Sequence, residues 1–441
     1  MSIFRSLFQF LQRHLLLTVL VVAFLGRLAA VLVIGSSELE HEYAPIVLNL
    51  AAGRGFVYYA VDQAGTLTTQ FLADPKLLIP SAFKSPVYPF FLFLWVKLFG
   101  AGLLGMRVIE ILQAGLGVLS AWLVYWIARE KLGQPQAILA AVGMAFYPLL
   151  VYSVTQISDT IIFLTLEILT LWLFLRLEKA DSMGFFLAFS FSLALFMLAR
   201  PEGFFYLPFF LFWLWRRFPG RWLSRLAGFA VICALVLSPW ALRNYFQLGR
   251  LALNTSGGLN LWEGQNRNAV GVPSWYVDPP ISLRPEAAAE IFGSGFDRQF
   301  EVKQDSIYLR EALADLRADP ARALSLAGRK FVFFWTSRFF GFNFTYAGAK
   351  SPIYWLPWLA MLPFFLFGLA LSLKEARKFG VFYLVFLVST FTCLLFFVLP
   401  RYTVLVYPWA ILFAAQGLWQ FYLMGMNWAT KVSNGSSARG V

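Results

Sequence analysis

The feature of this sequence that most constrains its fold is a series of long apolar runs. A helix needs about 20 mainly apolar residues to cross the hydrocarbon core of a bilayer. Ten runs reach or approach this length: 15–34, 103–128, 136–153, 158–175, 183–199, 203–215, 224–240, 352–372, 379–399 and 402–424. The run 203–215 is short and holds Pro208, so we expect it to span only with support from neighbouring helices.

The composition agrees with lipid as the surrounding solvent. The 441 residues are 59% hydrophobic and only 13% charged, whereas soluble domains carry about 25% charged residues. So few charged side chains could not cover the surface of a protein of this length in water. We therefore predict an all-α polytopic membrane protein, in which residues 1–441 form a single domain of about ten transmembrane helices.

The distribution of Lys and Arg predicts the orientation, because cytoplasmic turns near helix ends are basic. We place the N-terminus in the cytoplasm and the apolar stretch 86–99 along the outer membrane surface. Every inside turn is then basic: these turns hold Arg5, Arg13, Arg129, Lys131, Arg176, Lys179, Arg216, Arg217, Arg221, Arg225, Lys374, Arg377, Lys378 and Lys431. If 86–99 crossed the membrane, Arg129, Arg176 and Arg216 would face outward. We expect a multi-pass protein of the plasma (inner) membrane, surrounded by membrane lipids.

Two segments on the predicted outside are long, 35–102 and 241–351, and long loops in compact folds tend to be functional. The first contains several Gly and Pro residues, so we expect short interfacial helices joined by turns. The second has apolar residues at near-helical spacing around 296–318 and a short apolar stretch at 329–342 that is interrupted by Arg338. We expect catalysis in 35–102 and acceptor binding in 241–351, on the extracytoplasmic side.

The sequence offers few residues for a thiol or imidazole metal site. Cys233 and Cys393 both lie in apolar runs, as buried thiols do, and the chain has only two histidines. We therefore predict neither a disulfide framework nor a multi-histidine metal site.

Charged residues gather at the predicted outer ends of the helices. Glu38, Glu40 and Glu42 follow the first apolar run; a solvated helix start explains them as well, because carboxylates favour the positive end of the helix dipole. Four basic residues recur on the same side: Lys84, Arg200, Arg243 and Arg401. One such cation is explained as a snorkelling anchor, but four beside an acidic loop indicate an anionic headgroup site, since Arg donates to phosphate in a bidentate geometry. The pattern suggests group transfer from a phosphorylated lipid.

Several motifs carry a family resemblance in the order and spacing in which they occur. The segments are 42–56 (EYAPIVLNLAAGRGF), 83–89 (FKSPVYP), 97–100 (KLFG), Arg107, 238–245 (SPWALRNY), 260–266 (NLWEGQN) and Arg401-Tyr402 with Pro408. Together they resemble bacterial GT-C glycosyltransferases over residues 20–424. The kin are the dolichyl-phosphate-mannose-protein mannosyltransferase-like and RgtA/B/C/D-like proteins, with the aminoarabinose lipid A transferase as a more distant relative.

The resemblance implies inverting transfer of a hexosyl or pentosyl group from a polyprenyl-phosphate sugar donor. The acceptor is a lipid, glycan or protein, and no nucleic acid is involved. The catalytic base is Glu42 or Glu40; the family's acidic pair is missing here, because Leu39 stands beside Glu40. The remaining implied roles are donor-phosphate binding by Lys84, Arg243, Arg401 and Arg200, a second acidic position at Asp159, and sugar or acceptor contacts by Tyr43, Tyr88, Asn244, Glu263, Asn266 and Tyr402.

Four alternatives stay open at this point. Asp159 has a second interpretation as the N-cap of its helix, and Glu40, Glu42 and Asp159 are suitable oxygen ligands for a divalent cation, which the sequence neither requires nor excludes. A transporter or flippase of lipid-linked saccharides would carry charges along its spans, where we find Glu110 and Glu167. A polysaccharide ligase or polymerase would use similar lipid-linked substrates.

Overall fold

The computed structural model describes residues 14–39, 41–274, 281–293, 295–336 and 352–437. All ten apolar runs form helices within this part of the chain. They correspond to α2 (Leu15–Ile34), α5 (Leu103–Lys131), α6 (Gln134–Phe146) with α7 (Pro148–Tyr152) and η2 (Ser153–Thr155), α8 (Thr160–Lys179), α9 (Met183–Ala199), η3 (Pro201–Tyr206) with α10 (Leu207–Arg217), α11 (Trp222–Leu248), α16 (Pro352–Ser372), α17 (Ala376–Leu395), and α18 (Pro400–Thr403) with η7 (Val404–Val406) and α19 (Tyr407–Ser437).

Of the helices that the structure describes, fewer than ten are long and apolar enough to cross a membrane on their own. In the described residues, six helical segments are long and apolar enough to cross a membrane, or seven if the bent pair α6 and α7–η2 counts as one span. One of the six, Trp355–Leu395, contains both α16 and α17, joined by η6 (Leu373–Glu375). These two helices lie antiparallel, since Phe365 contacts Phe386 and Ser372 bonds to Tyr383. The predicted count of about ten is therefore not confirmed.

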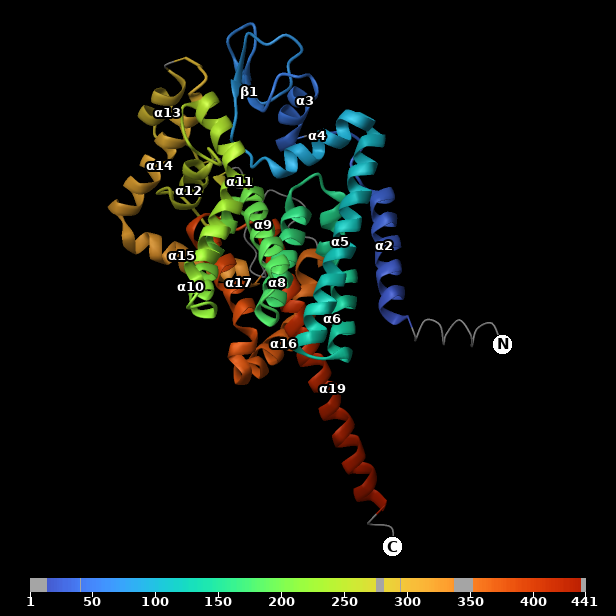
Figure 1. Cartoon of the computed structure of the whole chain (residues 1–441). Helices are drawn as coiled ribbons and strands as arrows, with labels where there is room; N and C mark the ends of the chain where they lie inside the picture. Colours follow the sequence, from blue (N-terminus) through green and yellow to red (C-terminus); the bar gives the residue numbers. More distant parts are fainter. Residues whose placement is uncertain (1–13, 40, 275–280, 294, 337–351, 438–441) are drawn as a thin grey trace.

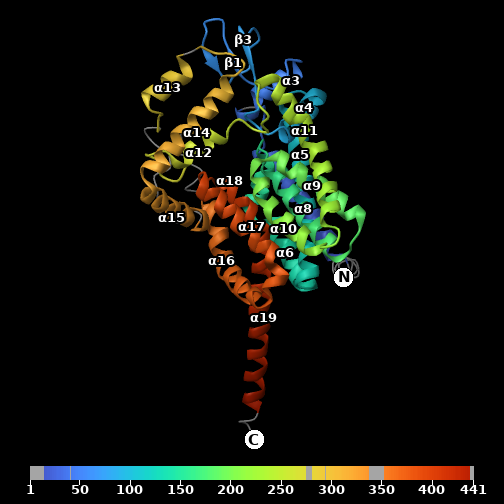
Figure 2. The ribbon, with the colours of Figure 1, turned by 60° about the vertical axis from the view of Figure 1, so that its left-hand side comes forward.

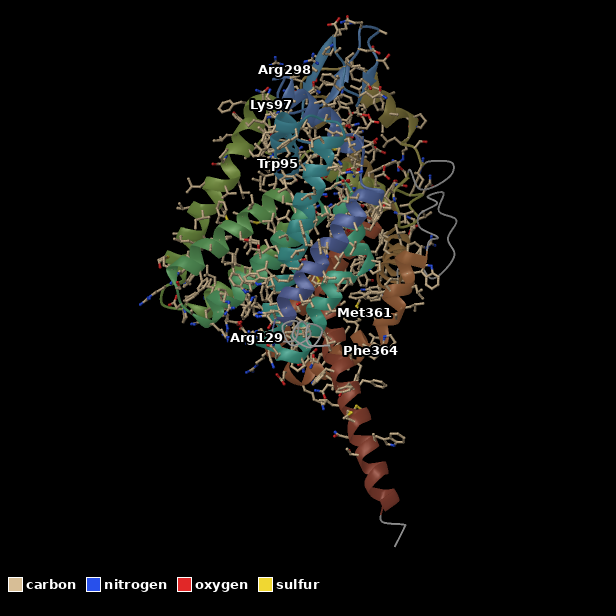
Figure 3. The ribbon with its side chains drawn as sticks, turned by 90° about the vertical axis from the view of Figure 1, so that its right-hand side faces the viewer. Trp95, Lys97, Arg129, Arg298, Met361 and Phe364 are labelled. Carbon is tan, nitrogen blue, oxygen red and sulfur yellow. The ribbon has the colours of Figure 1, made fainter. Side chains whose placement is uncertain are left out.

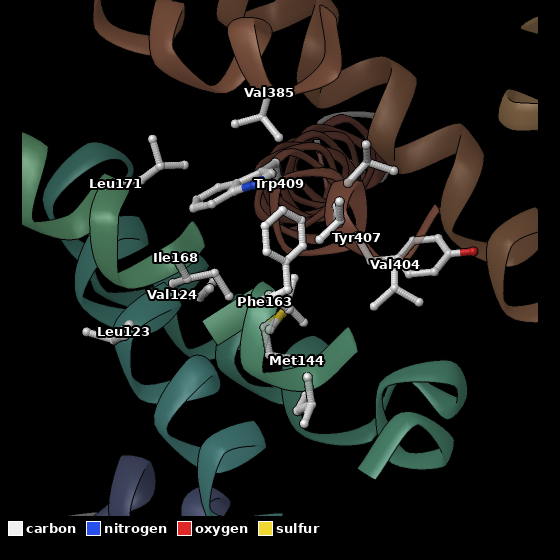
Figure 4. Packing of buried hydrophobic residues seen from close by; sticks show 14 of the residues in the cluster. Leu123, Val124, Met144, Phe163, Ile168, Leu171, Val385, Val404, Tyr407 and Trp409 are labelled. Carbon is white, nitrogen blue, oxygen red and sulfur yellow. The ribbon is translucent and has the colours of Figure 1, made fainter. Parts of the chain in front are cut away.

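The core of the bundle lies between α5, α6, α8, α9, α17 and α19. Aromatic rings fill it: Phe163 stacks on Phe196 with centroids 4.5 Å apart, and Phe382 stacks on Trp409 at 5.0 Å. Figure 4 shows the packing around Phe163 and Trp409. Helices α16 and α19 pack with their backbones in contact, because a Cβ atom on Gly368 would lie 1.8 Å from the carbonyl oxygen of Phe413.

The first outside segment holds a small sheet as well as helices. Its elements are η1 (His41–Tyr43), α3 (Ala44–Ala51), β1 (Val57–Val61), β2 (Leu67–Thr68), β3 (Leu77–Pro80) and α4 (Val87–Phe99). The strands form an antiparallel sheet in the order β2-β1-β3. This departs from the expected all-α segment, because the run Val-Tyr-Tyr-Ala-Val has high strand propensity and Gly65 turns the chain with φ +87°.

Helix α4 lies across the ends of the long helices rather than along them (Figure 1). Its 13 residues reach about 20 Å at 1.5 Å per residue, which is too short to cross a bilayer. This geometry agrees with the prediction that 86–99 follows the membrane surface.

The second outside segment is helical and joins the first. It contains α12 (Gly257–Gln265), α13 (Pro285–Phe292), α14 (Phe300–Ala318) and α15 (Pro320–Thr336). Helix α14 confirms the helix predicted near 296–318. Its Phe300 contacts Tyr59 of β1. Residues 337–342 of the apolar stretch 329–342 lie outside the described residues.

The first outside segment and helices α12, α13 and α14 of the second gather toward one end of the bundle, while α15 lies beside the bundle (Figures 1 and 2). Figure 3 places Lys97 near this end and Arg129 at the opposite end of α5, as the charge pattern predicts. The orientation of this end toward the extracytoplasmic side stays a prediction.

Candidate active site

Glu42 lies in η1, at the junction between the bundle and the outside segments. Its carboxylate accepts a hydrogen bond from Lys84 Nζ at 2.8 Å, and both Nη atoms of Arg401 lie 3.4 Å from Oε1. The Glu42 side chain is nevertheless 38% exposed. Although burial alone would raise the pKa of Glu42, the charges of Lys84 and Arg401 hold it well below its usual range.

A second ion pair lies close to the first. Arg200 binds Asp159 in a bidentate manner, with Nε donating to Oδ2 at 2.8 Å and Nη2 donating to Oδ1. Asp159 occupies the N-cap position of α8, but its side chain makes no capping hydrogen bond. The partner of Asp159 is therefore a cation, and the capping interpretation is not supported by the geometry.

Tyr402 connects the two pairs into one layer. Its ring lies 5.5 Å from Arg200 Cζ and 5.7 Å from Arg401 Cζ, distances at which a cation is attracted to the ring face. Asp159 is also within electrostatic range of Arg401 and Lys84. We call these six residues the charged layer: Glu42, Lys84, Asp159, Arg200, Arg401 and Tyr402.

Within the six residues of the charged layer three cations meet two carboxylates, and a further carboxylate, Glu202, lies within electrostatic range of Arg200 and Tyr402. Lys84, Arg200 and Arg401 face the carboxylates of Glu42 and Asp159. Within the described structure, two buried donors of this layer have no hydrogen-bond partner, Arg200 Nη1 and Arg401 Nε. Buried N–H groups of this kind are costly unless something accepts their bonds, so the layer is suited to bind an anion.

Two tyrosines form the inner wall beside the charged layer. The Tyr43 ring meets the Tyr88 ring edge-on at 4.8 Å, and Tyr88 donates to Gln113 at 2.8 Å. Gln113 in turn donates to the carbonyls of Val154 and Gln156, just before Asp159. Both tyrosines are buried. Their contacts fix η1, α4, α5 and the start of α8 relative to one another, and their predicted role in sugar contact stays a prediction.

Comparison with known proteins agrees with this architecture. The family model for dolichyl-phosphate-mannose-protein mannosyltransferase matches residues 83–242, while no curated protein matches the sequence. The structure is similar to the archaeal oligosaccharyltransferase AglB from Archaeoglobus fulgidus, solved in complex with an inhibitory peptide and a dolichol-phosphate. The TM-score is 0.54 at 15% identity, covering 96% of this chain and 52% of AglB.

This chain has a GT-C fold. The apo form of the same oligosaccharyltransferase matches with a TM-score of 0.53 at 13% identity, covering 95% of this chain and 52% of that chain. The GT-C chain described here thus spans about half the length of the oligosaccharyltransferase. ArnT from Cupriavidus metallidurans bound to undecaprenyl phosphate matches with a TM-score of 0.39 at 16% identity, covering 91% and 76%, a score that carries no structural inference.

The family match covers half of the charged layer of this GT-C chain. Residues 83–242 include Lys84, Asp159 and Arg200, whereas Glu42, Arg401 and Tyr402 lie outside the match. The complete layer is therefore evident only from the three-dimensional arrangement.

Besides Tyr43 and Tyr88, four predicted site residues do not join the layer, and Glu40 lies outside the described residues. The side chains of the four are engaged elsewhere: Arg243 donates to the carbonyls of Ser81 and Phe56, Asn244 to the carbonyl of Ala252, Asn266 to the carbonyl of Trp262, and Glu263 accepts from the amide and hydroxyl of Ser274. Arg243 thus has a backbone-binding role in this structure, and donor or acceptor contacts by these four residues stay predictions.

Of the three residues predicted as ligands of a divalent cation, Glu42 and Asp159 lie among the described residues and Glu40 does not. Among the described residues, no group of three His, Cys, Asp or Glu side chains is arranged to hold a metal ion. Glu42 and Asp159 each face a cation instead, which would repel a divalent ion.

Sequence reasoning missed Arg27, although it is the single charge in the run 15–34. Arg27 is buried in α2 and donates from Nη1 to the carbonyl of Ala145 at 2.7 Å and from Nη2 to that of Met144 at 2.8 Å. Helix α6 ends there with a 50° bend before Pro148, which has no N–H for the preceding turn. Arg27 therefore caps a broken helix, and a charge inside an apolar run is the signal that indicates such a role.

Proposed function

We propose that this protein is a membrane glycosyltransferase that moves a hexosyl or pentosyl group from a polyprenyl-phosphate donor to an extracytoplasmic lipid, glycan or protein. The observation that carries the proposal is the charged layer, in which three cations pair with two carboxylates and two Arg donors have no partner among the described residues. The GT-C fold supports the class of reaction. A dolichol-phosphate is present in the similar oligosaccharyltransferase, which agrees with a lipid-phosphate ligand.

The donor phosphate binds Lys84 and Arg401 in this proposal, with Arg200 adjacent. Arg401 lies only loosely against Glu42, at 3.4 Å, so a phosphate oxygen at ordinary hydrogen-bond distance is a better acceptor for its guanidinium. Phosphate and Glu42 then compete for the same two cations. Donor binding consequently weakens both ion pairs of Glu42.

This competition prepares Glu42 to act as a general base. In the ligand-free state the two cations keep the pKa of Glu42 low, and a carboxylate of low pKa is a weak base. Phosphate offsets the charges of Lys84 and Arg401, which raises the pKa of Glu42 toward its usual range. The base therefore becomes effective when the donor is in place.

The transfer itself is a single displacement. The acceptor oxygen or nitrogen forms a bond to the anomeric carbon while its proton moves to Glu42. The bond between that carbon and the phosphate oxygen breaks, and the polyprenyl phosphate leaves with the electron pair. Lys84 and Arg401 stabilise the charge of the leaving group, and one displacement inverts the configuration, as in inverting glycosidases.

The transporter alternative finds less support. Glu110 is paired with Arg107 and accepts from the amide of Ser36, and Glu167 accepts from Tyr206. These charges are bound locally at separate places. A ligase or polymerase would share the donor chemistry and differ from our proposal in its acceptor.

The binding step is tested with purified full-length protein in detergent, titrated with a polyprenyl phosphate and followed by tryptophan fluorescence. Lys84→Gln and Arg401→Gln each remove a charged hydrogen bond, so the affinity should fall about tenfold or more, and Arg401→Lys should recover only part of it. Lys97→Gln is the matched control, because Lys97 is exposed and donates to the carbonyl of Ala51 rather than to the charged layer. Unchanged affinity in both Gln variants would place the phosphate elsewhere.

The reaction is expected to need no divalent cation, for the reason given above. Treatment with EDTA should leave transfer unchanged. Loss of transfer on EDTA treatment, with recovery on adding Mg²⁺ or Mn²⁺, would show that the carboxylates are ligands in the donor complex.

A further inference from the structure

We propose that Glu301 is a positioning residue that holds residues 81–84 so that Lys84 reaches the charged layer. It couples the second outside segment to the site. The inference rests on the proposed function only in that Lys84 binds the donor phosphate.

Glu301 is buried at the start of α14, far from the surface that a glutamate normally occupies. Only 1% of the surface of Glu301 is exposed. Its Oε2 accepts a hydrogen bond from the amide of Ala82 at 2.9 Å and another from the hydroxyl of Thr255 at 2.7 Å. A buried carboxylate is unfavourable unless it is hydrogen-bonded; these two contacts satisfy Oε2, whereas Oε1 makes no hydrogen bond within the described structure.

The backbone of 81–83 is held by the same part of the protein. Its three carbonyls accept bonds from Arg243 (to Ser81), from the amide of Thr255 (to Ala82, 3.0 Å) and from Asn254 Nδ2 (to Phe83, 3.1 Å). Arg243 lies near the end of the bundle helix α11, and Asn254 and Thr255 follow that helix. The second outside segment therefore holds the carbonyls of 81–83, while the amide of Ser81 donates to the carbonyl of Phe56 and that of Phe83 to the Ser81 hydroxyl, both in the first segment.

Lys84 comes directly after this held segment. Its Nζ lies 2.8 Å from Glu42 and 5.6 Å from the centre of the Tyr43 ring. The Phe83 ring stacks on Tyr58 with centroids 4.7 Å apart. A displacement of the backbone at Ala82 would move Lys84 with it, and misplacing a binding group by about 1 Å can cost 10²-fold in rate.

Glu301 thus acts through Ala82 and Thr255 rather than on the substrate. The positioning role requires a buried oxygen at residue 301 that accepts hydrogen bonds from both the Ala82 amide and the Thr255 hydroxyl. Glutamine can supply one carbonyl oxygen to both donors, whereas leucine can accept neither. This difference separates a positioning role from simple filling of space.

The test uses purified full-length wild type, Glu301→Gln and Glu301→Leu. Amide hydrogen exchange of a peptide covering 81–84 should be slow in wild type, similar in Glu301→Gln, and at least tenfold faster in Glu301→Leu. Affinity for a polyprenyl phosphate should fall about tenfold in the Leu variant and be largely retained in the Gln variant. Thr255→Val, which removes one donor, should give a smaller loss and serves if Glu301→Leu does not fold.

Glu311→Leu is the matched control on the same helix. Glu311 is similarly buried, and its carboxylate pairs with Arg284 at 3.1 Å, away from 81–84. Slow exchange and normal affinity in both Glu301→Leu and Thr255→Val would overturn the inference. If wild type bound no polyprenyl phosphate, the proposed function would fail, while the exchange data would still decide whether Glu301 positions residues 81–84.

Discussion

Glu42 is 38% exposed while it faces two cations, whereas Asp159 is 16% exposed and is held by the buried Arg200. The first carboxylate can exchange its partners for a ligand, because water and substrate reach it. The Asp159 carboxylate is bound by Arg200 through two hydrogen bonds and is less accessible to water and substrate. We therefore propose that Glu42 accepts the proton and that Asp159 orients Arg200.

Glu42→Gln should lower turnover by about 10²–10⁴-fold, the usual contribution of a general base. Its melting temperature should barely change, since a partly exposed ion pair contributes less than about 1 kcal/mol. Glu38→Gln, in the same loop and exposed, is the control and should retain turnover. A Glu42→Gln protein with turnover within twofold of wild type would remove Glu42 from the mechanism.

Asp159→Asn distinguishes the ion pair from a helix cap. Asn caps helices as well as Asp does, so a capping role predicts almost no loss of stability. Leaving the buried Arg200 without its carboxylate instead costs about 3 kcal/mol or more, because Arg200 is 8% exposed. Thermal unfolding of the purified variant measures the difference, and an unchanged melting temperature would favour the cap.

At the scale of elements, the break between α6 and α7 depends on Arg27. Arg27→Met leaves the carbonyls of Met144 and Ala145 without their donors, which should lower the free energy of unfolding by about 2–4 kcal/mol. Gly117→Ala should act in the same direction, because its Cβ atom would lie 2.8 Å from Arg27 Nε. Gly115→Ala is the control, since nothing lies within 4 Å of a Cβ atom there; equal melting temperatures for both alanine variants would contradict this role of Arg27.

Titration of the buried Glu301 should make the free energy of unfolding depend on pH. Burial raises its pKa to about 7, and the groups facing it are Arg243 of α11, which favours its charge, and Tyr58 and Tyr59 of β1. In the unfolded chain the same carboxyl loses its proton near pH 4.5. Between pH 4.5 and 7 the folded protein therefore keeps a proton that the unfolded chain has lost. The free energy of unfolding should therefore fall by up to roughly 3 kcal/mol as pH rises from about 4.5 to 7, with no further change from this group above pH 7.

The contribution of Glu301 is isolated by comparing wild type with Glu301→Gln, which cannot titrate. Melting temperatures measured between pH 4.5 and 8 should converge or cross as pH rises, with the Gln variant losing less stability over this range. Parallel curves for the two proteins would show that Glu301 is ionised throughout.

At the scale of the whole molecule, the bundle was predictable and the site only in part. Apolar runs become helices because lipid leaves the backbone no other partner, which is why every predicted run is helical. The sheet at β1 was signalled by its β-branched and aromatic residues. Arg243 and Arg401 were indistinguishable by sequence, because both lie beside aromatic residues at helix ends. Only tertiary contacts, such as those joining Arg401 to Glu42 359 positions away, separate their roles.

The orientation of the molecule is tested by cysteine labelling in intact cells. Cysteines replacing Lys131 and Arg217 should resist an impermeant thiol reagent in a Cys233→Ala, Cys393→Ala background, because both positions lie in predicted cytoplasmic turns. A cysteine replacing Lys97, near the opposite end (Figure 3), should react. Ready labelling at 131 and 217 would reverse the predicted topology.

The most direct measurement is release of free polyprenyl phosphate when purified full-length protein is incubated with polyprenyl-phosphate sugars and membrane lipid acceptors. We expect wild type to release polyprenyl phosphate in step with glycosylated acceptor. The Glu40→Gln, Glu42→Gln double variant should bind the donor and release almost none. Full transfer by the double variant would contradict the account, since neither Glu40 nor Glu42 would then be needed as the base.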